Sequence, residues 1–404
     1  MILQKSILIA PAHYYINQYS QSEFYLSYQI LHGLMIKNPD IHFYVLCGFW
    51  EHKLSLPSNC TIREKYARPI KNITLSARIL FYHWVSVQSF YIAMRHKPYL
   101  IWHFLPNGPS SFNLFILLKM HKLFKMNAVY GPLQSFHNGL DTIQINNEKP
   151  TVLKDNIYQN IISKAYIFTN YYLKQFNKLI YISKSAEHSY KKLLINPDSC
   201  NNKSSVISNG VSLEKFLPVK NNLNDKINLL FVGNLTQNKR VDLVLHLALQ
   251  LHHKSKLGSV TIVGDGIEMN ALKILSQTLG LEKLCKFTGS IPNDQVSSYF
   301  TKSHFLCLFS EREGFPHVIL EAMSSGIPVL LSNFEFANEI VDSYHCGYIL
   351  TDRNENGIRS LVEEIILLDD TKYQSIKANN IINSKKHDWP FIIQQYSNII
   401  SKSS

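Results

Sequence analysis

The chain has 404 residues, of which 46% are apolar and 17% are charged, a globular composition that excludes a disordered or low-complexity protein. This length exceeds one ordinary hydrophobic core and predicts two domains of roughly 150 to 200 residues each. No uninterrupted apolar run reaches about 18 residues, so a membrane-spanning helix is not expected. The scattered cysteines are expected to be buried, reduced thiols rather than disulfides or zinc ligands.

The net charge of +12 originates entirely in the first half of the chain. Residues 1 to 200 contain 21 Lys and Arg against 9 Asp and Glu, whereas residues 201 to 404 contain 20 of each kind. One sign of charge on one domain favours an anionic lipid surface, a phosphorylated glycolipid or nucleic acid as partner. An uneven but solvated surface is the alternative. The segment from Met1 to Ala10 lacks the pattern of a signal peptide, which predicts a cytoplasmic protein.

The first half alternates short apolar strands with helices longer than ten residues. Strands are predicted at 6–11, 42–47, 100–104, 128–130 and 179–183, and helices at 22–35, 75–96, 112–124 and 154–177. This alternation predicts right-handed βαβ units around a parallel sheet.

Phe112 to Met126 is a candidate amphipathic basic helix. Lys119, Lys122 and Lys125 recur at three-residue spacing beside apolar residues. The pattern suits a helix lying in lipid headgroups, and it equally suits a core helix with a solvated basic edge. Peripheral docking of this domain on an anionic membrane is therefore a hypothesis.

A reversing linker is predicted where Asn209-Gly210-Val211 leads to Phe216-Leu217-Pro218, because Asn-Gly allows left-handed backbone and proline prevents continuation. A second strand and helix series follows. Its strands are predicted at 228–232, 259–263, 286–288, 305–309, 327–331 and 349–350, with helices at 241–251 and 357–368. The segment from Asp388 onward is predicted to form a last helix with an apolar face.

The loop from Gly233 to Arg240 follows a strand and precedes a helix, the position at which parallel sheets bind ligands. Lys239 and Arg240 lie at the helix start, where a cation opposes the helix dipole, so an anionic ligand is expected there. Gly264-Asp265-Gly266 follows the next strand and is predicted to be framework near the site.

Two glutamates, Glu313 and Glu321, flank a Gly-Phe-Pro turn that opens a predicted helix. A helix N-terminus presents unpaired N–H groups and a partial positive charge, so Gly314 to Ile319 can receive an anion between the two carboxylates. Two solvated glutamates on a helix face are the alternative interpretation.

The string Glu313-Gly314-Phe315-Pro316, Glu321-Ala322-Met323 and Gly326-x-Pro328-Val329 resembles the nucleotide-binding signature of retaining glycosyltransferases of family 4. The resemblance implies an α/β fold of the GT-B type, with two Rossmann-like βαβ domains facing a central cleft. Residues 1–203 would be the acceptor domain and residues 204–387 the donor domain, with a helix at 388–404 returning to the first.

The resemblance also implies an activity. A sugar would pass from a nucleotide diphosphate sugar to a hydroxyl of a growing glycan or glycolipid, with retained configuration and without a metal or other cofactor. The expected setting is bacterial surface polysaccharide biosynthesis, meaning lipopolysaccharide, capsule or exopolysaccharide.

In the family, the residue matching Glu313 and the neighbouring backbone hold the donor sugar, and the residue matching Glu321 binds the ribose. Lys239 matches a lysine on the donor diphosphate, whereas Asn234 stands where an arginine is usual and Arg240 is its candidate replacement. Glu313 and Lys239 are thus the expected catalytic residues. The other expected donor-binding residues are Gly233, Asn234, Arg240, Ser290, Ile291, Gly314, Phe315, Pro316, His317, Val318, Ile319 and Glu321.

The first domain departs from the family pattern, because Pro11 to Tyr15 replaces its Gly-Gly loop. His13 and His103 are candidates for contact with acceptor or phosphate. Two alternatives remain open: a nucleotide-sugar epimerase with the same nucleotide site, and a basic nucleic-acid-binding module. The second lacks a recognisable nucleic-acid motif, so nucleic acid is not an expected partner.

Overall fold

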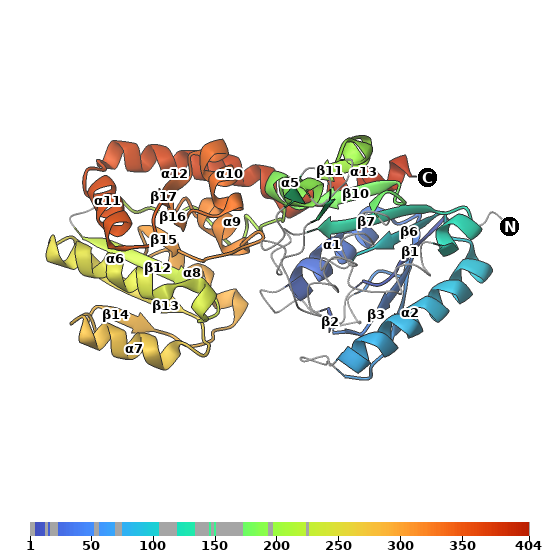
Figure 1. The fold of residues 1–404 in the computed structure, drawn as a ribbon, viewed down its shortest axis with the longest axis horizontal. Helices are drawn as coiled ribbons and strands as arrows, with labels where there is room; N and C mark the ends of the chain where they lie inside the picture. Colours follow the sequence, from blue (N-terminus) through green and yellow to red (C-terminus); the bar gives the residue numbers. More distant parts are fainter. Residues whose placement is uncertain are drawn as a thin grey trace. The chain divides into compact units, whose positions relative to one another are not determined.

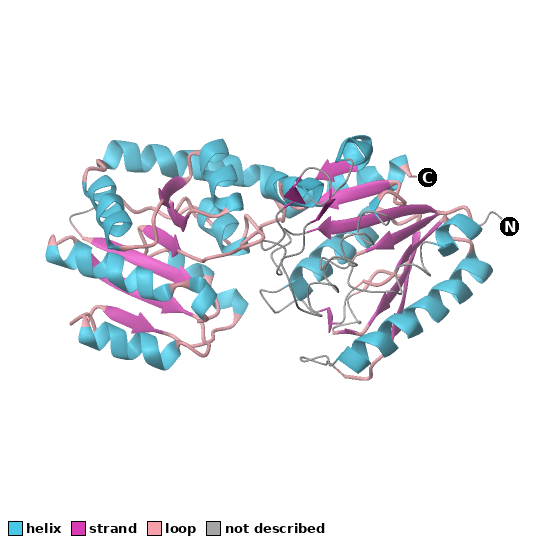
Figure 2. Cartoon of the chain, in the orientation of Figure 1, coloured by secondary structure: helices cyan, strands magenta, loops and turns pink. Residues whose placement is uncertain are grey.

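The computed structural model describes residues 5–12, 15–16, 23–51, 56–68, 75–104, 119–133, 145–146, 149–150, 173–192, 197–223 and 226–403. The chain divides into two units, Met1–Ser208 with Pro390–Ser404, and Asn209–Trp389. Each unit is a sheet covered by helices (Figures 1 and 2). The boundaries thus follow Ser208 and Trp389, whereas the sequence pattern places them after residues 203 and 387.

The sheet of the first unit has seven strands in the order β11-β10-β7-β6-β1-β3-β5, and all its pairings are parallel. Its strands are β1 (Ser6–Ile9), β3 (His42–Cys47), β5 (Cys60–Glu64), β6 (Leu100–His103), β7 (Asn127–Leu133), β10 (Lys178–Tyr181) and β11 (Ser204–Val206). Two short pairs lie apart from it, β2 (Tyr15–Ile16) with β4 (Phe49–Trp50) and β8 (Ile145–Asn146) with β9 (Lys149–Pro150). Strands β1 and β6 are buried along their whole length, as expected of a parallel sheet covered on both faces.

Among the described residues, the helices of the first unit are α1 (Glu23–Lys37), α2 (Leu75–His96), α5 (Lys184–Lys192), the 3₁₀ helix η3 (Pro197–Lys203) and α13 (Trp389–Lys402). Helix α13 packs on the sheet of the first unit: the ring of Tyr396 lies 5.8 Å from that of Trp102, and both side chains are fully buried. Most of the predicted helices 112–124 and 154–177 lies outside the described residues.

The second unit contains a six-stranded sheet in the order β14-β13-β12-β15-β16-β17, also entirely parallel. Its strands are β12 (Ile227–Val232), β13 (Leu257–Val263), β14 (Cys285–Phe287), β15 (Phe305–Leu308), β16 (Val329–Ser332) and β17 (Gly347–Leu350). The order reverses between β12 and β15, so the loops after these two strands meet although they are far apart in sequence.

The helices of the second unit lie between these strands and after the last one (Figure 1). They are η4 (Gln237–Lys239), α6 (Val241–His253), α7 (Met269–Thr278), η5 (Asn293–Gln295), α8 (Ser297–Phe300), α9 (His317–Ser324), α10 (Glu335–Tyr344), α11 (Glu355–Ile366), α12 (Asp370–Ser384) and η6 (Lys385–His387). No helix among the described residues is long and apolar enough to cross a membrane. All six cysteines are thiols outside any disulfide, as expected, although Cys60 and Cys285 are partly exposed.

The structure gives a different reason for the glycine at position 210 of the linker than the left-handed backbone that was predicted. Gly210 does not have a positive φ, so left-handed backbone is not what the position requires. A Cβ atom there would lie 2.5 Å from the indole of Trp389, so the glycine provides room for that ring. The next residue, Val211, forms a parallel β-bridge with Asp388. This bridge joins the first and the last residues of the second unit to each other.

Candidate functional site

The predicted ligand loops all follow strands of the second sheet. They come after β12, β13, β14 and β15, which are consecutive neighbours in the sheet and run parallel. The carboxyl ends of these strands therefore meet at one edge, where α/β sheets bind their ligands. The topology thus brings the separate motifs of the sequence to one place.

Three glycines at this edge join the strand ends through main chain. The N–H of Gly233 donates to the carbonyl of Val263 at 3.0 Å, and the N–H of Gly264 donates to the carbonyl of Gly289 at 3.1 Å. A Cβ atom on Gly264 would lie 1.9 Å from the carbonyl oxygen of Gly233. A Cβ atom on Gly266 would likewise lie 2.2 Å from the carbonyl oxygen of Leu235. Gly264 and Gly266 are therefore framework, as predicted, and we call this main-chain assembly the glycine floor.

The loop after β15 is fastened to the loop after β12. The N–H of Glu311 donates to the carbonyl of Asn238 at 2.8 Å, and the side-chain amide of Asn238 donates to the carbonyl of Arg312 at 3.0 Å. These bonds bring Lys239 against Glu313, where the ammonium donates to carboxylate Oε1. The two expected catalytic residues are therefore an ion pair, with side chains only 21% and 12% exposed.

A buried serine orients this pair. The Oγ of Ser310, which is fully buried, donates to Oε1 of Glu313 at 2.7 Å. Its own carbonyl accepts a hydrogen bond from Oγ of Ser332 at 2.5 Å. Sequence reasoning assigned no role to either serine, and the only local signal is their position at the ends of the neighbouring strands β15 and β16.

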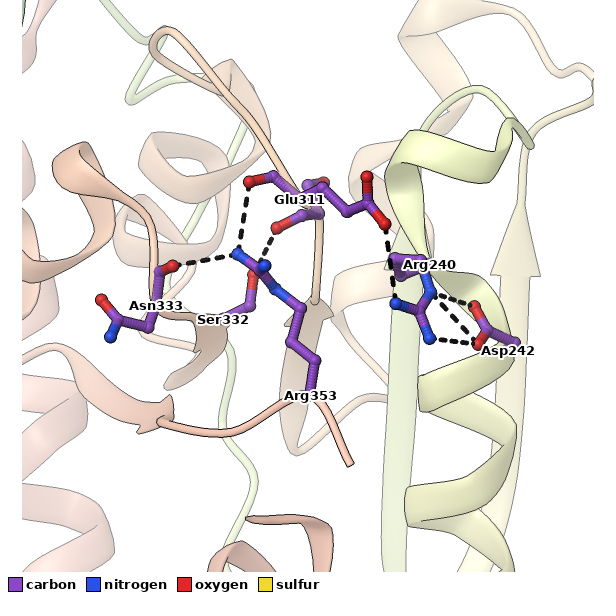
Figure 3. A network of polar contacts seen from close by, with 7 residues as sticks. Arg240, Asp242, Glu311, Ser332, Asn333 and Arg353 are labelled. Atoms are coloured by element: carbon purple, nitrogen blue, oxygen red, sulfur yellow. Dashed lines mark hydrogen bonds and ion pairs between the residues drawn. The ribbon is translucent and has the colours of Figure 1, made fainter. Parts of the chain in front are cut away.

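Arg240 is engaged by carboxylates of the protein itself. Its guanidinium binds Asp242 in a two-pronged contact of 3.0 and 2.8 Å and approaches Glu311 at 3.6 Å (Figure 3). Its hydrogen bond to Asp242 is the main cause that raises the pKa of Arg240. The cationic helix start that suggested an anionic ligand is therefore already balanced within the chain, for Arg240 by these carboxylates and for Lys239 by Glu313.

Arg353 is a further cation at this edge, and no sequence motif predicted its position. One guanidinium nitrogen donates to the main-chain carbonyls of Glu311 at 3.2 Å and Asn333 at 2.9 Å (Figure 3). It thereby ties the loop after β15 to the loop after β16. We interpret Arg353 as a support for the Glu311 to Glu313 segment.

Glu321 lies in α9, eight positions after Glu313, and is partly buried. Burial raises the pKa of Glu321 to about 7, and the nearby Lys215 ammonium only partly opposes this shift. Lys215 is itself half-buried and donates to Oδ1 of Asn293 at 3.1 Å. A carboxylate that can exchange a proton near neutral pH, beside a lysine, is typical of functional sites.

The Gly-Phe-Pro turn before α9 is fixed by packing of apolar side chains in the interior. The ring of Phe315 is 8% exposed and lies 4.1 Å from the ring of Phe336, so its side chain packs in the interior. The side chain of Ile319 is fully buried, and its N–H is bound to the carbonyl of Pro316. The side chains of these two expected donor-binding residues therefore support the turn, and the expected contact of this segment with the donor through backbone N–H groups stays a prediction.

His317 is the first residue of α9 and is partly buried. Its ring bonds with the backbone of Gly210, and burial lowers the pKa of His317 to about 4. The amide of Asn209 reaches the carbonyl of Phe315 at 3.4 Å. The linker thus fastens the turn.

The remaining expected donor-binding residues are at least partly exposed at the same edge. Gly233 and Asn234 follow β12, Ser290 and Ile291 follow Gly289, and Gly314, Pro316 and Val318 surround the start of α9.

His103 does not have the surroundings of a ligand. Its ring lies in the core of the first unit, 1% exposed, 5.3 Å from the ring of Phe176 and 6.4 Å from that of Tyr130. Both ring nitrogens lack hydrogen-bond partners, and burial lowers the pKa of His103 to about 3. The expected contact with acceptor or phosphate is therefore corrected, because the ring is enclosed by aromatic side chains. His13 lies outside the described residues.

Solved structures share this architecture over nearly the whole chain. HepE of Anabaena in complex with UDP superposes with a TM-score of 0.67 at 15% identity, covering 98% of this chain and 100% of that one. WaaG, a glycosyltransferase involved in lipopolysaccharide biosynthesis, gives a TM-score of 0.66 at 15% identity, covering 98% and 99%. The fold is therefore GT-B, with two Rossmann-like units, as expected.

Residues 214–386 match the family described as glycosyl transferases group 1. The UDP-Gal:alpha-D-GlcNAc-diphosphoundecaprenol alpha-1,3-galactosyltransferase of Escherichia coli is 32% identical over 214 residues, 50% of this chain and 53% of that protein. The O-antigen biosynthesis glycosyltransferase WclY of Escherichia coli is 30% identical over 175 residues, 41% and 46% of the two chains. The matches span about half the length of these relatives. The match to the glycosyl transferases group 1 family thus lies within the second unit, Asn209–Trp389.

Proposed function

We propose that this protein is a retaining glycosyltransferase that moves a sugar from a nucleotide diphosphate sugar to a hydroxyl of a glycan or lipid-linked acceptor. The observation that carries the proposal is the Lys239 and Glu313 pair, held at the carboxyl edge of the second sheet by bonds between two loops. Relatives named as glycosyltransferases and structural neighbours with bound UDP support it.

Lys239 and Glu313 would exchange partners when the donor binds. The Lys239 ammonium would turn to the diphosphate, whose negative charge grows as the sugar leaves, and would stabilise that charge. The Glu313 carboxylate, no longer paired, would accept hydrogen bonds from hydroxyls of the donor sugar. Ser310 would keep its oxygen oriented, since that bond is independent of Lys239.

Glu321 would bind the ribose hydroxyls, because an ionised carboxylate can accept two hydrogen bonds from neighbouring hydroxyls. Backbone groups at Ser290 and Ile291 would contact the base, and the first turn of α9 would add N–H groups to the diphosphate site. Gly233, Asn234 and Gly314 would line the donor. We propose that no metal ion is required, which addition of a chelator to the assay would test.

The biological setting that we propose is bacterial surface polysaccharide biosynthesis, on the cytoplasmic side of the membrane. Relatives named for O-antigen and amylovoran biosynthesis support this setting. The basic excess in the first half of the chain supports an acceptor or surface that is anionic.

The proposal is tested by thermal unfolding with UDP, GDP and their common sugar derivatives. A ligand at 100 times its dissociation constant should add about 2.7 kcal/mol to the free energy of unfolding. If none of these ligands stabilised the protein, the proposed function would be refuted. Nucleoside diphosphate released only in the presence of an acceptor would distinguish transfer from epimerisation.

A further inference from the structure

Helix α2 is apolar on two opposite faces. Its inner face packs into the first unit through Phe81, Val85 and Ile92, which are fully buried. Its outer face carries Leu80, Val87, Phe90, Tyr91 and Met94, which are 43 to 61% exposed. A helix that is apolar all round is normally covered on all sides, and a single scattered exposed leucine would need no explanation. Here the exposed residues recur at helical spacing and form one stripe.

The stripe continues onto a second segment of the chain. The ring of Phe124 meets that of Phe90 at 5.6 Å in an edge-on contact. Beside Phe124, Leu123 is 68% exposed, the largest value among the large apolar residues that the structure describes in this unit. We define the α2 stripe as Leu80, Val87, Phe90, Tyr91, Met94 and Leu123. In Figure 1, α2 runs along one border of the first unit, with no other labelled element outside it.

The sequence segment that contains the α2 stripe carries Lys and Arg but no acidic residues. Residues 65 to 140 contain nine Lys and Arg and no Asp or Glu. Of these cations, Arg95, Lys97, Lys119, Lys122 and Lys125 are exposed. The three lysines belong to the segment that carries Leu123, and Arg95 and Lys97 lie at the C-terminal end of α2.

We infer that the α2 stripe is the surface by which the protein lies on an anionic lipid bilayer, its apolar side chains entering the headgroup region and the surrounding cations contacting lipid phosphates. Apolar area and positive charge together are what binding in a membrane interface requires. An apolar protein partner would match the stripe but not the exposed cations beside it, whereas an acidic bilayer matches both. The partner named here refines the membrane hypothesis, and the inference does not depend on sugar transfer.

The test is flotation of the whole chain with vesicles of phosphatidylcholine alone or with about 30% phosphatidylglycerol. We expect binding to the anionic vesicles that weakens at about 0.5 M salt, and little binding to the neutral ones. The variant Val87→Glu with Met94→Glu should bind anionic vesicles about tenfold more weakly or worse. Both positions are more than half exposed, so the variant should fold.

The matched control is Ile274→Glu with Ile382→Glu, which changes the net charge equally at helix positions 63% and 59% exposed in the second unit. The control should bind vesicles like the wild type. Equal loss in both variants would reduce the effect to net charge and overturn the inference. A dimer in lipid-free solution that the Val87→Glu, Met94→Glu variant dissociates would also overturn it, because a second copy would then cover the stripe.

Nucleotide binding, measured on the same preparations, keeps the two proposals separate. Intact nucleotide binding with lost vesicle binding supports the inference. Vesicle binding without any nucleotide binding would refute the proposed function and leave the inference standing.

Discussion

Lys239 and Glu313 form an ion pair although 74 residues separate them in the chain. They meet because β12 and β15 are neighbours in the sheet and because Asn238 joins the two loops through both its carbonyl and its side chain. The pair occupies the positions proposed to face the diphosphate and the sugar of the donor. Without a bound donor, the Lys239 ammonium and the Glu313 carboxylate thus neutralise each other.

The pair should be coupled in stability and in binding. Lys239→Met leaves Glu313 without its cation, so we expect this variant to be less stable than the double variant with Glu313→Gln, by about 1 kcal/mol. Urea unfolding of the wild type, both single variants and the double variant measures this coupling. Lys239→Met should also weaken nucleoside diphosphate binding about tenfold or more. Additive effects on unfolding would contradict the coupling.

Ser310→Ala tests the orientation of Glu313. Loss of its hydrogen bond should lower kcat about tenfold while KM for the donor changes little, because the carboxylate remains present but is less well oriented. Ser276→Ala is the control, since that serine is also buried and its hydroxyl donates to the carbonyl of Lys273 within α7. A similar fall in kcat for both serine variants would show a general effect of packing.

Glu321→Gln should change stability and binding in opposite directions. The pKa of Glu321 is raised from 4.5 to about 7 by burial, so the folded protein binds more protons than the unfolded chain in this range, and the carboxyl costs stability as pH rises through it. The free energy of unfolding of the neutral variant should therefore equal that of the wild type near pH 4 and exceed it above pH 7, by at most about 3 kcal/mol. Its nucleotide affinity should nevertheless fall, because the amide replaces one ribose acceptor by a donor. Calorimetry between pH 5 and about 8 checks both effects, and unchanged affinity at the upper end would contradict the ribose role.

Arg240→Met should leave nucleoside diphosphate binding within about threefold of the wild type, because the guanidinium is already bound by Asp242 and Glu311. The lost ion pairs are partly exposed, so the free energy of unfolding should fall by only about 1 kcal/mol. Titration calorimetry beside Lys239→Met provides the comparison. A loss as large as that of Lys239→Met would make Arg240 a diphosphate ligand.

His103→Phe should be tolerated or stabilising. Both ring nitrogens are buried without partners, and an apolar ring of similar shape avoids that cost. Because burial lowers the pKa of His103 from 6.5 to about 3, the unfolded chain binds more protons below pH 6.5, and the histidine costs stability as pH falls. The variant should thus gain about 2 kcal/mol over the wild type at pH 5, with unchanged transferase activity. Loss of activity in a stable His103→Phe variant would restore the histidine as an acceptor ligand.

The sequence predicted elements well where short apolar runs were bounded by turn residues, as in β3 and β12. It missed β5, whose residues Cys60 to Glu64 alternate polar and apolar and are all only partly buried. It also missed α10 and α12, which carry many polar residues on their exposed sides.

At the site, the local motifs placed Lys239, Glu313 and Glu321 at one edge, because strand and loop order can be read along the chain. The contacts between side chains of different loops could not be predicted in this way. The contact of Arg240 with Glu311, the bond from Ser310 and the proximity of Lys215 to Glu321 all depend on which strands become neighbours or on which side chains are enclosed. Gly210 shows the same limit, because its need for space comes from a tryptophan distant in sequence.

The glycine floor has a consequence for how such a site can diverge. Its geometry depends on peptide groups in contact, so even one added methyl at Gly264 would force two loops apart. The side chains that project around it, such as Asn234, do not support it and can be exchanged without disturbing it. A chain built in this way can acquire a new ligand preference by substitution at the edge of the site, while the main-chain support stays unaltered.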